Sequence, residues 1–324
     1  MTITLRFHET GGPEVLRVEN IDVAAPGPGE ARVRHHAIGL NFIDIYQRSG
    51  LYKVPLPSGA GNEGAGVVEA IGEGVTWVKP GDRVAYAGGP IGSYCEVRNM
   101  PADRLCMLPE DISYEQAAAM MLKGMTVQYL IRRTYAVQAG DTVLFHAASG
   151  GVGLIACQWL KALGATVIGT AGSEEKCALA RAHGADHCID YRTENFVERV
   201  REITHGTGVR VVYDSVGKDT FLGSLDCLQP LGMMVSFGNA SGPVPPFDPG
   251  LLTQKGSLFF TRPSLFSNTA RRSDLEATAQ ELFDIVHSGQ VKIDIGQRYA
   301  LANAAEAHRD MEARKTTGAG ILIP

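Results

Sequence analysis

The stretch from Asp141 to Gly153 reads Asp-Thr-Val-Leu-Phe-His-Ala-Ala-Ser-Gly-Gly-Val-Gly, and the rest of the chain is organised around it. Residues Thr142 to His146 are apolar and rich in strand-forming side chains, which predicts a short buried strand. The small residues that follow predict a tight turn. Ile155, Trp159 and Leu163 then recur every four residues. This spacing places one apolar stripe on a helix that starts directly after the turn.

A strand, a glycine turn and a helix in this order form the opening of a dinucleotide-binding βαβ unit. Gly150 and Gly151 allow the backbone to turn tightly and approach a pyrophosphate, while Gly153 allows the helix to pack close to the sheet. The helix N-terminus supplies N–H groups and the positive end of its dipole. A glycine turn alone is equally typical of an ordinary loop. The flanking strand and helix favour the nucleotide site.

The length, charge and residue composition of the chain limit the classes of protein to which it can belong. A length of 324 residues predicts about two domains, and 44% hydrophobic with 20% charged residues is typical of a soluble globular enzyme. A formal net charge of -5 argues against an extended basic surface, so no nucleic-acid partner is expected. No apolar run reaches the ~18 residues of a membrane span, and no signal-peptide core opens the chain. Six scattered cysteines without metal spacing indicate reduced thiols in a cytoplasmic protein without a membrane partner.

Residues 1 to about 110 carry short strands separated by Gly/Pro turns, which predicts a compact barrel-like β domain. The predicted strands are Thr2–Phe7, Ala31–Gly39, Gly64–Ile71, Asp82–Ala87 and Ser93–Val97. A short helix is predicted near Asn41–Arg48. A longer helix begins at the Ser-x-x-Gln capping box of Ser113–Gln116 and runs toward Leu130.

From Thr142 onward, strands alternate with helices, which predicts a doubly wound parallel sheet with its ligand at the strand C-terminal ends. The predicted strands are Thr142–His146, Thr166–Thr170, His187–Ile189, Val209–Tyr213, Met233–Phe237 and Leu258–Thr261, with helices at Glu174–His183, Phe196–Ile203 and Phe221–Leu228. A further helix is predicted at Asp274–Ser288. The apolar strand Gly320–Ile323 is expected to rejoin the first domain.

Six motifs spread over nearly the full length are shared with one known family. They are Gly61–Gly72, Val78–Val84, Leu122–Thr126, Ala147–Gly153, Tyr213–Gly217 and Thr261–Ser264. Through them the chain resembles the medium-chain dehydrogenase/reductase superfamily in its zinc-free quinone oxidoreductase branch, which includes NADPH:quinone reductases and zeta-crystallin. The resemblance implies an α/β fold, with a GroES-like β-barrel catalytic domain over 1–123 that is completed by 265–324. It implies a Rossmann domain over 124–264 and an NADPH site in the cleft between them.

Departures from the zinc alcohol dehydrogenases of this superfamily indicate that no metal is bound. Those enzymes have a Cys at the position of Asn41 and a His at the position of Asn62. An amide is a poor zinc ligand compared with thiolate or imidazole. The cysteine-rich lobe that holds their structural zinc also has no counterpart here. Glu63 remains, and without a metal we expect it to be structural.

Without zinc, the substrate carbonyl must be polarised by hydrogen bonds, and Asn41, Tyr46 and Tyr52 lie in the segment that lines the cleft in the family. Their amide and hydroxyl groups can donate to the carbonyl, so they are the predicted catalytic residues. Two alternatives stay open: Asn41 as the N-cap of the short helix, and Tyr46 as a core aromatic. Asp44 is expected to be solvated or to contact the cofactor ribose, and not to act as a general base.

The predicted cofactor contacts lie in the glycine turn and after strand ends, or are implied by the family resemblance. The predicted set is Asn41, Phe42, Ile43, Asp44, Ile45, Lys123, Thr126, Tyr129, Ser149, Gly150, Gly151, Val152, Gly172, Ser173, Lys176, Tyr191, Val216, Phe237, Gly238, Asn239, Ala240, Leu265, Phe266, Ser267 and Arg314. Three of these residues have an alternative interpretation. Lys123 can be a surface lysine, Thr126 an ordinary helix threonine, and Arg314 a solvated charge on a helix.

A preference for NADPH over NADH is predicted from the end of the second strand of this unit. An NAD site places an acid there to bind the ribose 2′-hydroxyl, whereas this strand ends Gly169-Thr-Ala-Gly-Ser173. Lys176, the Ser173 hydroxyl and Tyr191 can bind a 2′-phosphate instead. Glu174 and Glu175 are expected to point away from it.

We therefore predict an enzyme that transfers hydride from NADPH to a quinone or a conjugated carbonyl. The alternatives are an alkenal or enone reductase of the same branch, and a crystallin-like protein that binds NADPH without turnover. A homodimer is expected through Ser257–Thr261. This apolar strand would be a bare sheet edge in a monomer, and pairing with a twofold mate removes the edge.

Overall fold

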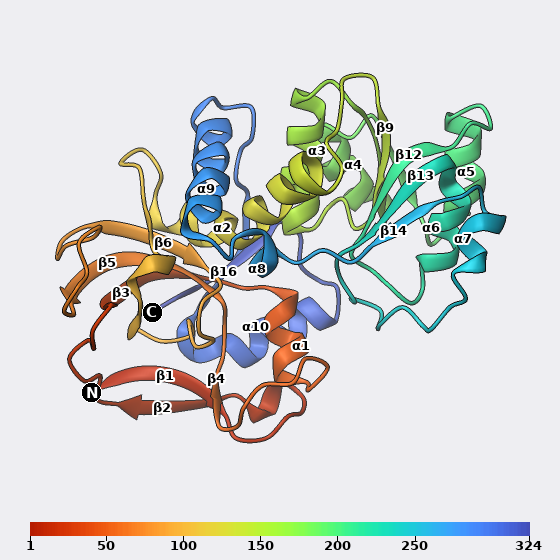
Figure 1. Ribbon diagram of the computed structural model, residues 1–324. Coiled ribbons are helices and arrows are strands. Elements are labelled where there is room, and N and C mark those ends of the chain that lie inside the picture. The colour runs from red at the N-terminus through yellow and green to blue at the C-terminus, as the bar shows by residue number, and fades with distance from the viewer. The chain divides into compact units, whose positions relative to one another are not determined.

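The computed structural model describes every residue from Met1 to Pro324, and the chain divides into two compact units. Unit 1 comprises Met1–Met125, Thr269–Phe283 and Ile293–Pro324, and unit 2 comprises Thr126–Asn268 and Asp284–Lys292. Each unit has its own sheets and its own core (Figure 1). The domain limits expected from the sequence, at residues 123 and 264, stay a proposal.

Unit 2 is built on a six-stranded sheet in the order β11-β10-β9-β12-β13-β14, with every neighbouring pair parallel. Its strands are β9 (Thr142–Phe145), β10 (Thr166–Ala171), β11 (His187–Asp190), β12 (Val209–Asp214), β13 (Leu228–Ser236) and β14 (Phe259–Thr261). Its helices are α3 (Gly151–Ala162), α4 (Glu174–Ala182), α5 (Phe196–Ile203), α6 (Phe221–Cys227), α7 (Gly250–Gln254) and α8 (Leu265–Asn268). Helices α3 and α4 cover one face and α5 and α6 the other, so the predicted doubly wound sheet is confirmed (Figure 1).

The central strand β9 is apolar because both of its faces are covered by helices. Val143, Leu144 and Phe145 are all at most 1% exposed. Helix α3 packs tightly against this strand, since a Cβ atom on Gly153 would lie 2.4 Å from the carbonyl oxygen of Ala147. Only glycine permits this approach, as expected from the sequence.

Unit 1 contains two sheets. The larger has the order β15-β16-β3-β5-β6-β8 with β7 paired to β3, and the smaller has the order β2-β1-β4. The strands are β1 (Thr2–Phe7), β2 (Arg17–Ile21), β3 (Glu30–Gly39), β4 (Ser58–Gly59), β5 (Glu63–Ile71), β6 (Arg83–Ala87), β7 (Val97–Pro101), β8 (Cys106–Met107), β15 (Ile295–Ala300) and β16 (Ala319–Ile323). The main helices are α1 (Phe42–Arg48), α2 (Tyr114–Tyr129, ending in unit 2), α9 (Arg272–His287, also ending in unit 2) and α10 (Ala304–Glu312).

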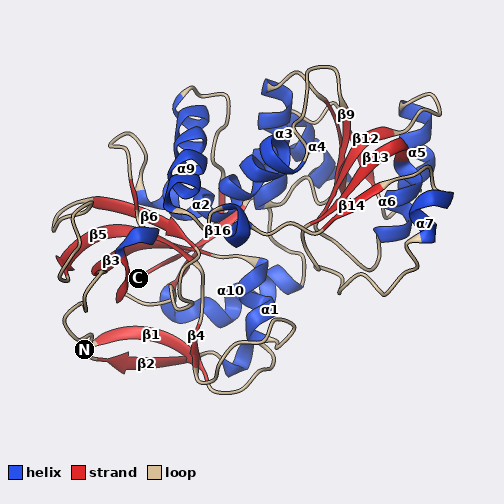
Figure 2. Ribbon diagram, viewed as in Figure 1, coloured by secondary structure: helices blue, strands red, loops and turns tan.

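Helices α1 and α10 lie between the two sheets of unit 1 (Figure 2). One core holds them there, with Phe7 of β1, Ile38 of β3, Ile45 of α1 and Ala307 of α10 packed together and at most 6% exposed. Strand β16 pairs with β3 through Leu322 opposite Ile38. The C-terminal strand therefore rejoins the first domain, as predicted.

Unit 1 differs from the sequence-based expectation at several elements, and strands β2, β4 and β8 were not predicted. The predicted strand Ser93–Val97 is wrong, because β7 begins only at Val97. The N–H groups of Tyr94 and Glu96 instead bind the carbonyls of Ala60 and Ile3, outside the main sheet. Strand β15 and helix α10 were not predicted.

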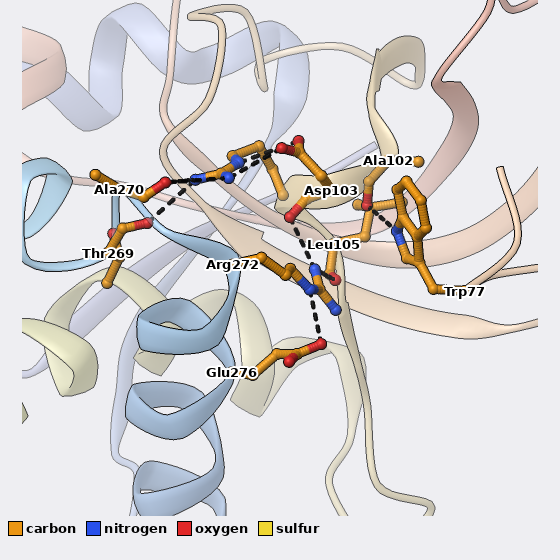
Figure 3. A network of polar contacts seen from close by, with 9 residues as sticks. Trp77, Ala102, Asp103, Leu105, Thr269, Ala270, Arg272 and Glu276 are labelled. Carbon is orange, nitrogen blue, oxygen red and sulfur yellow. Dashed lines mark hydrogen bonds and ion pairs between the residues drawn. The ribbon is translucent and has the colours of Figure 1, made fainter. Parts of the chain in front are cut away.

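The chain re-enters unit 1 at Thr269, and two arginines hold it against the turn at residues 102–105 (Figure 3). Arg104 donates from Nη1 to the carbonyl of Thr269 at 3.1 Å, and Arg272 donates from Nη1 to the carbonyl of Asp103 at 2.8 Å. Trp77 binds the same turn by donating to the carbonyl of Ala102 at 2.7 Å. These bonds fix the start of α9, directly after α8.

All six cysteines are free, and every one except the half-buried Cys188 is buried. None of the helices combines the length and the apolar character needed to cross a bilayer.

Candidate nucleotide and substrate site

The carboxyl ends of parallel strands meet at one edge of a sheet. Most of the sequence-predicted cofactor residues of unit 2 follow these strand ends, whereas Thr126 and Tyr129 lie on α2. The predicted residues that follow β9, β10, β11, β12, β13 and β14 are, in that order, Ser149–Val152, Gly172–Lys176, Tyr191, Val216, Phe237–Ala240 and Leu265–Ser267. In the sheet, β9 lies between β10 and β12, where the strand order reverses direction. Ligands of doubly wound sheets bind at this reversal.

The glycine turn sits at the reversal point. Ala147 adopts a left-handed conformation with φ 55°, and Ala148 donates its N–H to the carbonyl of Thr170 on the neighbouring strand at 2.9 Å. Gly150 is the N-cap of α3, and a Cβ there would meet a single atom, the carbonyl oxygen of Ala147, in a tight contact at 3.3 Å. The N–H groups of the first turn of α3 are the donors that would face an anion at this point.

A second anion position follows β10. The hydroxyl oxygen of Ser173 accepts the N–H of Lys176 at 3.3 Å and so caps α4. A Cβ atom on Gly172 would lie 2.6 Å from the Tyr191 hydroxyl and 3.6 Å from Nε of Arg192. The fold thus brings the Tyr191 phenol and the Arg192 guanidinium to Gly172, next to the Ser173-capped start of α4 that carries Lys176. Arg192 was missed by the sequence analysis, and its signal was its place next to Tyr191.

Two acids, Glu174 and Glu175, lie next to this position in the sequence, and both were expected to point away from the phosphate. The Glu174 carboxylate forms an ion pair with Arg181, seven residues further along α4. Its negative charge is therefore directed along the helix and away from the N-terminus. The ion pair favours the expectation that Glu174 points away from a 2′-phosphate, and for both Glu174 and Glu175 this stays a prediction.

A buried polar network beneath the edge ties three strand ends together and was also missed. His146, after β9, contacts Thr170 Oγ1 of β10 at 2.9 Å and Ser224 Oγ of α6 at 3.0 Å. Ser224 donates to Asp214 at 2.9 Å, and the other carboxylate oxygen of Asp214 accepts the N–H of Val216 at 2.7 Å. Burial lowers the pKa of His146. A neutral imidazole therefore links the loops that follow β9, β10 and β12.

In unit 1, Asn41 occupies the N-cap position of α1, but its side chain serves another partner. Its Nδ2 donates to Oε2 of Glu63 at 2.7 Å, and Lys123 Nζ lies 3.2 Å from the same oxygen. The two predicted site residues Asn41 and Lys123 are thus brought together. Lys123 is 5% exposed, so the alternative of a surface lysine is wrong.

Asp44 is 1% exposed, so the expectation that it is solvated is wrong. Its carboxylate accepts the N–H of Asn41 at 2.9 Å, Nδ2 of Asn62 at 2.7 Å and the hydroxyl of Tyr94 at 2.9 Å. Burial raises its pKa from 3.8 to about 6, and the hydrogen bonds from Asn62 and Tyr94 limit the rise. Because these donors occupy the carboxylate, a contact of its side chain with a ribose stays a prediction.

The polar chain continues from Tyr94 to the surface of unit 1. The Tyr94 hydroxyl lies 3.0 Å from Nε2 of His308 on α10, and Arg48 Nη1 lies 3.3 Å from Nδ1 of the same ring. Arg48 also pairs with Glu312 at 2.5 Å. Burial, together with the Arg48 charge, lowers the pKa of His308 to about 3. The start of α1 is therefore anchored to α10 through neutral and paired groups.

The other predicted residues of unit 1 lie on α1 and after it. Tyr46 is 9% exposed and meets the half-buried Tyr52 edge to face at 5.3 Å. Phe42 is 37% exposed, at the first position of the helix. Arg314 is exposed, which agrees with the solvated charge considered as its alternative, although it lies just after α10 with φ 57°.

Comparison with known proteins identifies the family. The family model described as alcohol dehydrogenase GroES-like domain matches residues 27–137, and the one described as zinc-binding dehydrogenase matches 151–284. A quinone oxidoreductase of Pseudomonas aeruginosa is 57% identical over the full length of both chains. The crystal structure of Escherichia coli quinone oxidoreductase complexed with NADPH has a TM-score of 0.98 at 52% identity, covering 99% of this chain and 100% of that one. A 2-haloacrylate reductase of Burkholderia is 44% identical over 100% of this chain and 99% of its own.

The chain belongs to the quinone oxidoreductase branch of the medium-chain dehydrogenase/reductase superfamily.

For a member of this branch, the two asparagines at the zinc-ligand positions have defined partners. Asn41 donates to Glu63, and Asn62 donates to Asp44 and to Gln47 at 2.7 and 2.8 Å. No group of three or more His, Cys, Asp or Glu residues in the chain could hold a metal ion. Both amides donate to acidic or amide oxygens, and the expectation that no metal is bound stays a prediction.

Proposed function

We propose that this chain is an NADPH-dependent quinone reductase. The observation that carries the proposal is the group around Gly172, where the Tyr191 hydroxyl, Arg192 and the capped start of α4 with Lys176 come together without an acid at the end of β10. An NAD site would have a carboxylate at that strand end. Two cations and two hydroxyls suit a 2′-phosphate instead.

The residues of unit 2 fit the rest of the cofactor. The N-terminus of α3, which begins directly after its N-cap Gly150, would hold the pyrophosphate. The loops that begin at Val216 and Phe237 follow adjacent strands and would face the nicotinamide half. When bound, NADPH supplies the hydride for the reaction.

The residues of unit 1 supply donors for the substrate. Asn41 has one amide hydrogen engaged by Glu63, which leaves the second for a carbonyl oxygen. Tyr46 and Tyr52 place their rings together on and after α1. In the proposed reaction these groups polarise the quinone carbonyl, and no metal takes part.

A second candidate, reduction of a conjugated carbon–carbon double bond, is favoured by one observation. The relative named 2-haloacrylate reductase covers the whole chain at 44% identity. Hydrogen-bond donors at a carbonyl suit either substrate, because both accumulate negative charge on oxygen. A protein that binds NADPH without turnover is the third possibility carried over from the sequence.

One panel of substrates separates the three. NADPH oxidation is followed by the loss of its near-ultraviolet absorption with benzoquinone, naphthoquinone, a short alkenal and 2-chloroacrylate. We expect the quinones to give the highest kcat/KM. Highest kcat/KM with the alkenal or the acrylate supports the second candidate, and NADPH binding without any oxidation supports the third.

We also propose that two copies pair through β14, in the cytoplasm. Strand β14 is the terminal strand of its sheet and pairs only with β13. Phe259 on it is 56% exposed. An apolar, unpaired edge of this kind is suited to pairing with a second copy about a twofold axis.

A further inference from the structure

Glu63, expected from the sequence to be only structural, is the meeting point of the donors in unit 1. It is the first residue of β5 and is fully buried. Its carboxylate accepts Nδ2 of Asn41 at 2.7 Å, the N–H of Leu122 at 2.7 Å and Nζ of Lys123 at 3.2 Å. The donors come from the start of α1 and the middle of α2, which are far apart in the sequence.

A carboxylate only accepts hydrogen bonds, so it decides how the amide of Asn41 is turned. The NH2 group must face Glu63, because the opposite orientation would place the amide oxygen against a negative oxygen. The same carboxylate oxygen also faces the ammonium of Lys123 at 3.2 Å. Removing this charge would leave a buried ammonium without its partner, which is strongly unfavourable.

The carboxylate has no freedom to move. A Cβ atom on Gly39 would lie 2.1 Å from Oε2 of Glu63 and 2.3 Å from the carbonyl oxygen of Ala118. The backbone of β3 therefore lies directly against the acid. A carboxylate confined in this way keeps its donors in one mutual geometry.

We propose that Glu63 is a positioning residue of the reductase reaction, which orients the Asn41 amide toward the substrate carbonyl and holds the Lys123 ammonium beside it. The inference rests on the proposed function and deepens it. Glu63 itself touches neither substrate nor cofactor. It gives the metal-free site a fixed pair of donors.

The test combines Glu63→Gln, which keeps the shape and removes the charge, with Asn41→Ala and Lys123→Met. The measurements are kcat and KM with benzoquinone, the NADPH dissociation constant by fluorescence titration, and unfolding in urea. We expect Glu63→Gln to lower kcat about 10- to 150-fold, the range for one charge-assisted hydrogen bond. NADPH affinity should fall by a smaller factor than kcat, because the phosphate-binding residues belong to unit 2 and Glu63→Gln affects only contacts made through Asn41 and Lys123.

The decisive comparison is made in the background that lacks both donors. In Asn41→Ala/Lys123→Met, adding Glu63→Gln should lower kcat by less than about twofold, since nothing remains to be positioned. The same loss as in wild type would overturn the proposal. A parallel loss of NADPH affinity, kcat and folded protein would also overturn it, because it would show a purely structural role.

Two controls keep the result interpretable. Glu96→Gln removes another carboxylate of unit 1, which accepts from Thr2 and the N–H of Ile3, and should leave kcat unchanged. If Glu63→Gln does not fold, Lys123→Met/Glu63→Gln is compared with Lys123→Met, and a further loss through Asn41 is expected; no further loss contradicts the proposal. The turnover of the wild-type protein alone tests the proposed function, so an inactive wild type would contradict that function. An active wild type whose kcat does not respond to the variants would contradict only the role of Glu63.

Discussion

Nδ2 of Asn62 lies 2.7 Å from Oδ1 of Asp44, deep in unit 1, at a position where zinc-dependent members of the superfamily carry a histidine ligand. An amide lacks the basic nitrogen of the histidine that it replaces, and the NH2 group of Asn62 is already engaged by this buried carboxylate. We therefore expect purified protein to contain no stoichiometric zinc and to keep its full quinone reductase activity in a strong chelator. Elemental analysis and a chelator titration, run beside a zinc alcohol dehydrogenase as control, test this. One tightly bound zinc per chain would contradict it.

The buried carboxyl of Asp44 predicts a pH dependence of stability. Burial raises its pKa from 3.8 to about 6, so the folded protein holds this proton more tightly than the unfolded chain does. The resulting stabilisation is complete below about pH 4 and is lost as pH rises through 6. A shift of this size corresponds to about 3 kcal/mol at most.

The measurement is the difference in free energy of unfolding between wild type and Asp44→Asn. We expect the value for wild type minus variant to fall between about pH 4 and pH 7. His35 and His308, whose pKa values burial lowers to about 4 and about 3, act in the opposite direction in both proteins and cancel in the difference. A difference that is flat or rises with pH would contradict the prediction.

The cations near Gly172 should determine cofactor preference. Lys176→Ala should weaken NADPH about 10- to 150-fold and leave NADH nearly unchanged, because only NADPH carries the 2′-phosphate. Arg192→Ala should act in the same direction with a smaller effect, since its side chain is exposed and screened. Titration of both cofactors measures this, with Lys161→Ala as the neutral control, because Lys161 lies in the last turn of α3 and pairs with Asp186, which precedes β11. Equal losses of affinity for NADPH and NADH would show that neither Lys176 nor Arg192 binds the 2′-phosphate.

Alanine substitutions of two glycines in the same turn, Gly150 and Gly153, should have different effects on stability and on NADPH binding. Gly153→Ala places a methyl group 2.4 Å from the carbonyl oxygen of Ala147 and should destabilise the fold by about 1–3 kcal/mol or more. Gly150→Ala meets its nearest atom at 3.3 Å and should cost less than about 1 kcal/mol, yet weaken NADPH by crowding the helix N-terminus. Urea unfolding and NADPH titration of both variants separate the two effects. Equal stability of the variants would exclude the assigned packing role of Gly153.

The sheet edge at β14 predicts the oligomeric state. Phe259→Lys should convert a dimer into a monomer in sedimentation at micromolar concentration, because the charge lies on the strand proposed to pair. Leu222→Lys on α6 is the matched control, since the two side chains are 56% and 58% exposed. A wild-type protein that sediments only as a monomer would refute the proposed pairing.

The nucleotide-binding unit could be predicted from the sequence because its information is local. The strand, the turn and the start of the helix are contiguous from Asp141 to Gly153. The close approach that Gly153 permits is set by atoms only a few residues away. The alternation of strands and helices in the rest of unit 2 follows from periodicity in the same way.

Only the tertiary structure decided which side chains of the site are buried and with whom they pair. Asp44 was expected to meet solvent, but Tyr94 and Asn62 cover it, and His308 joins the same chain across 214 residues of sequence. Arg192 becomes a candidate only when β10 and β11 lie side by side. The pattern of apolar and polar residues along a chain predicts the local backbone conformation. The desolvation and the hydrogen-bond partners of a polar group depend instead on distant segments of the chain that pack around it.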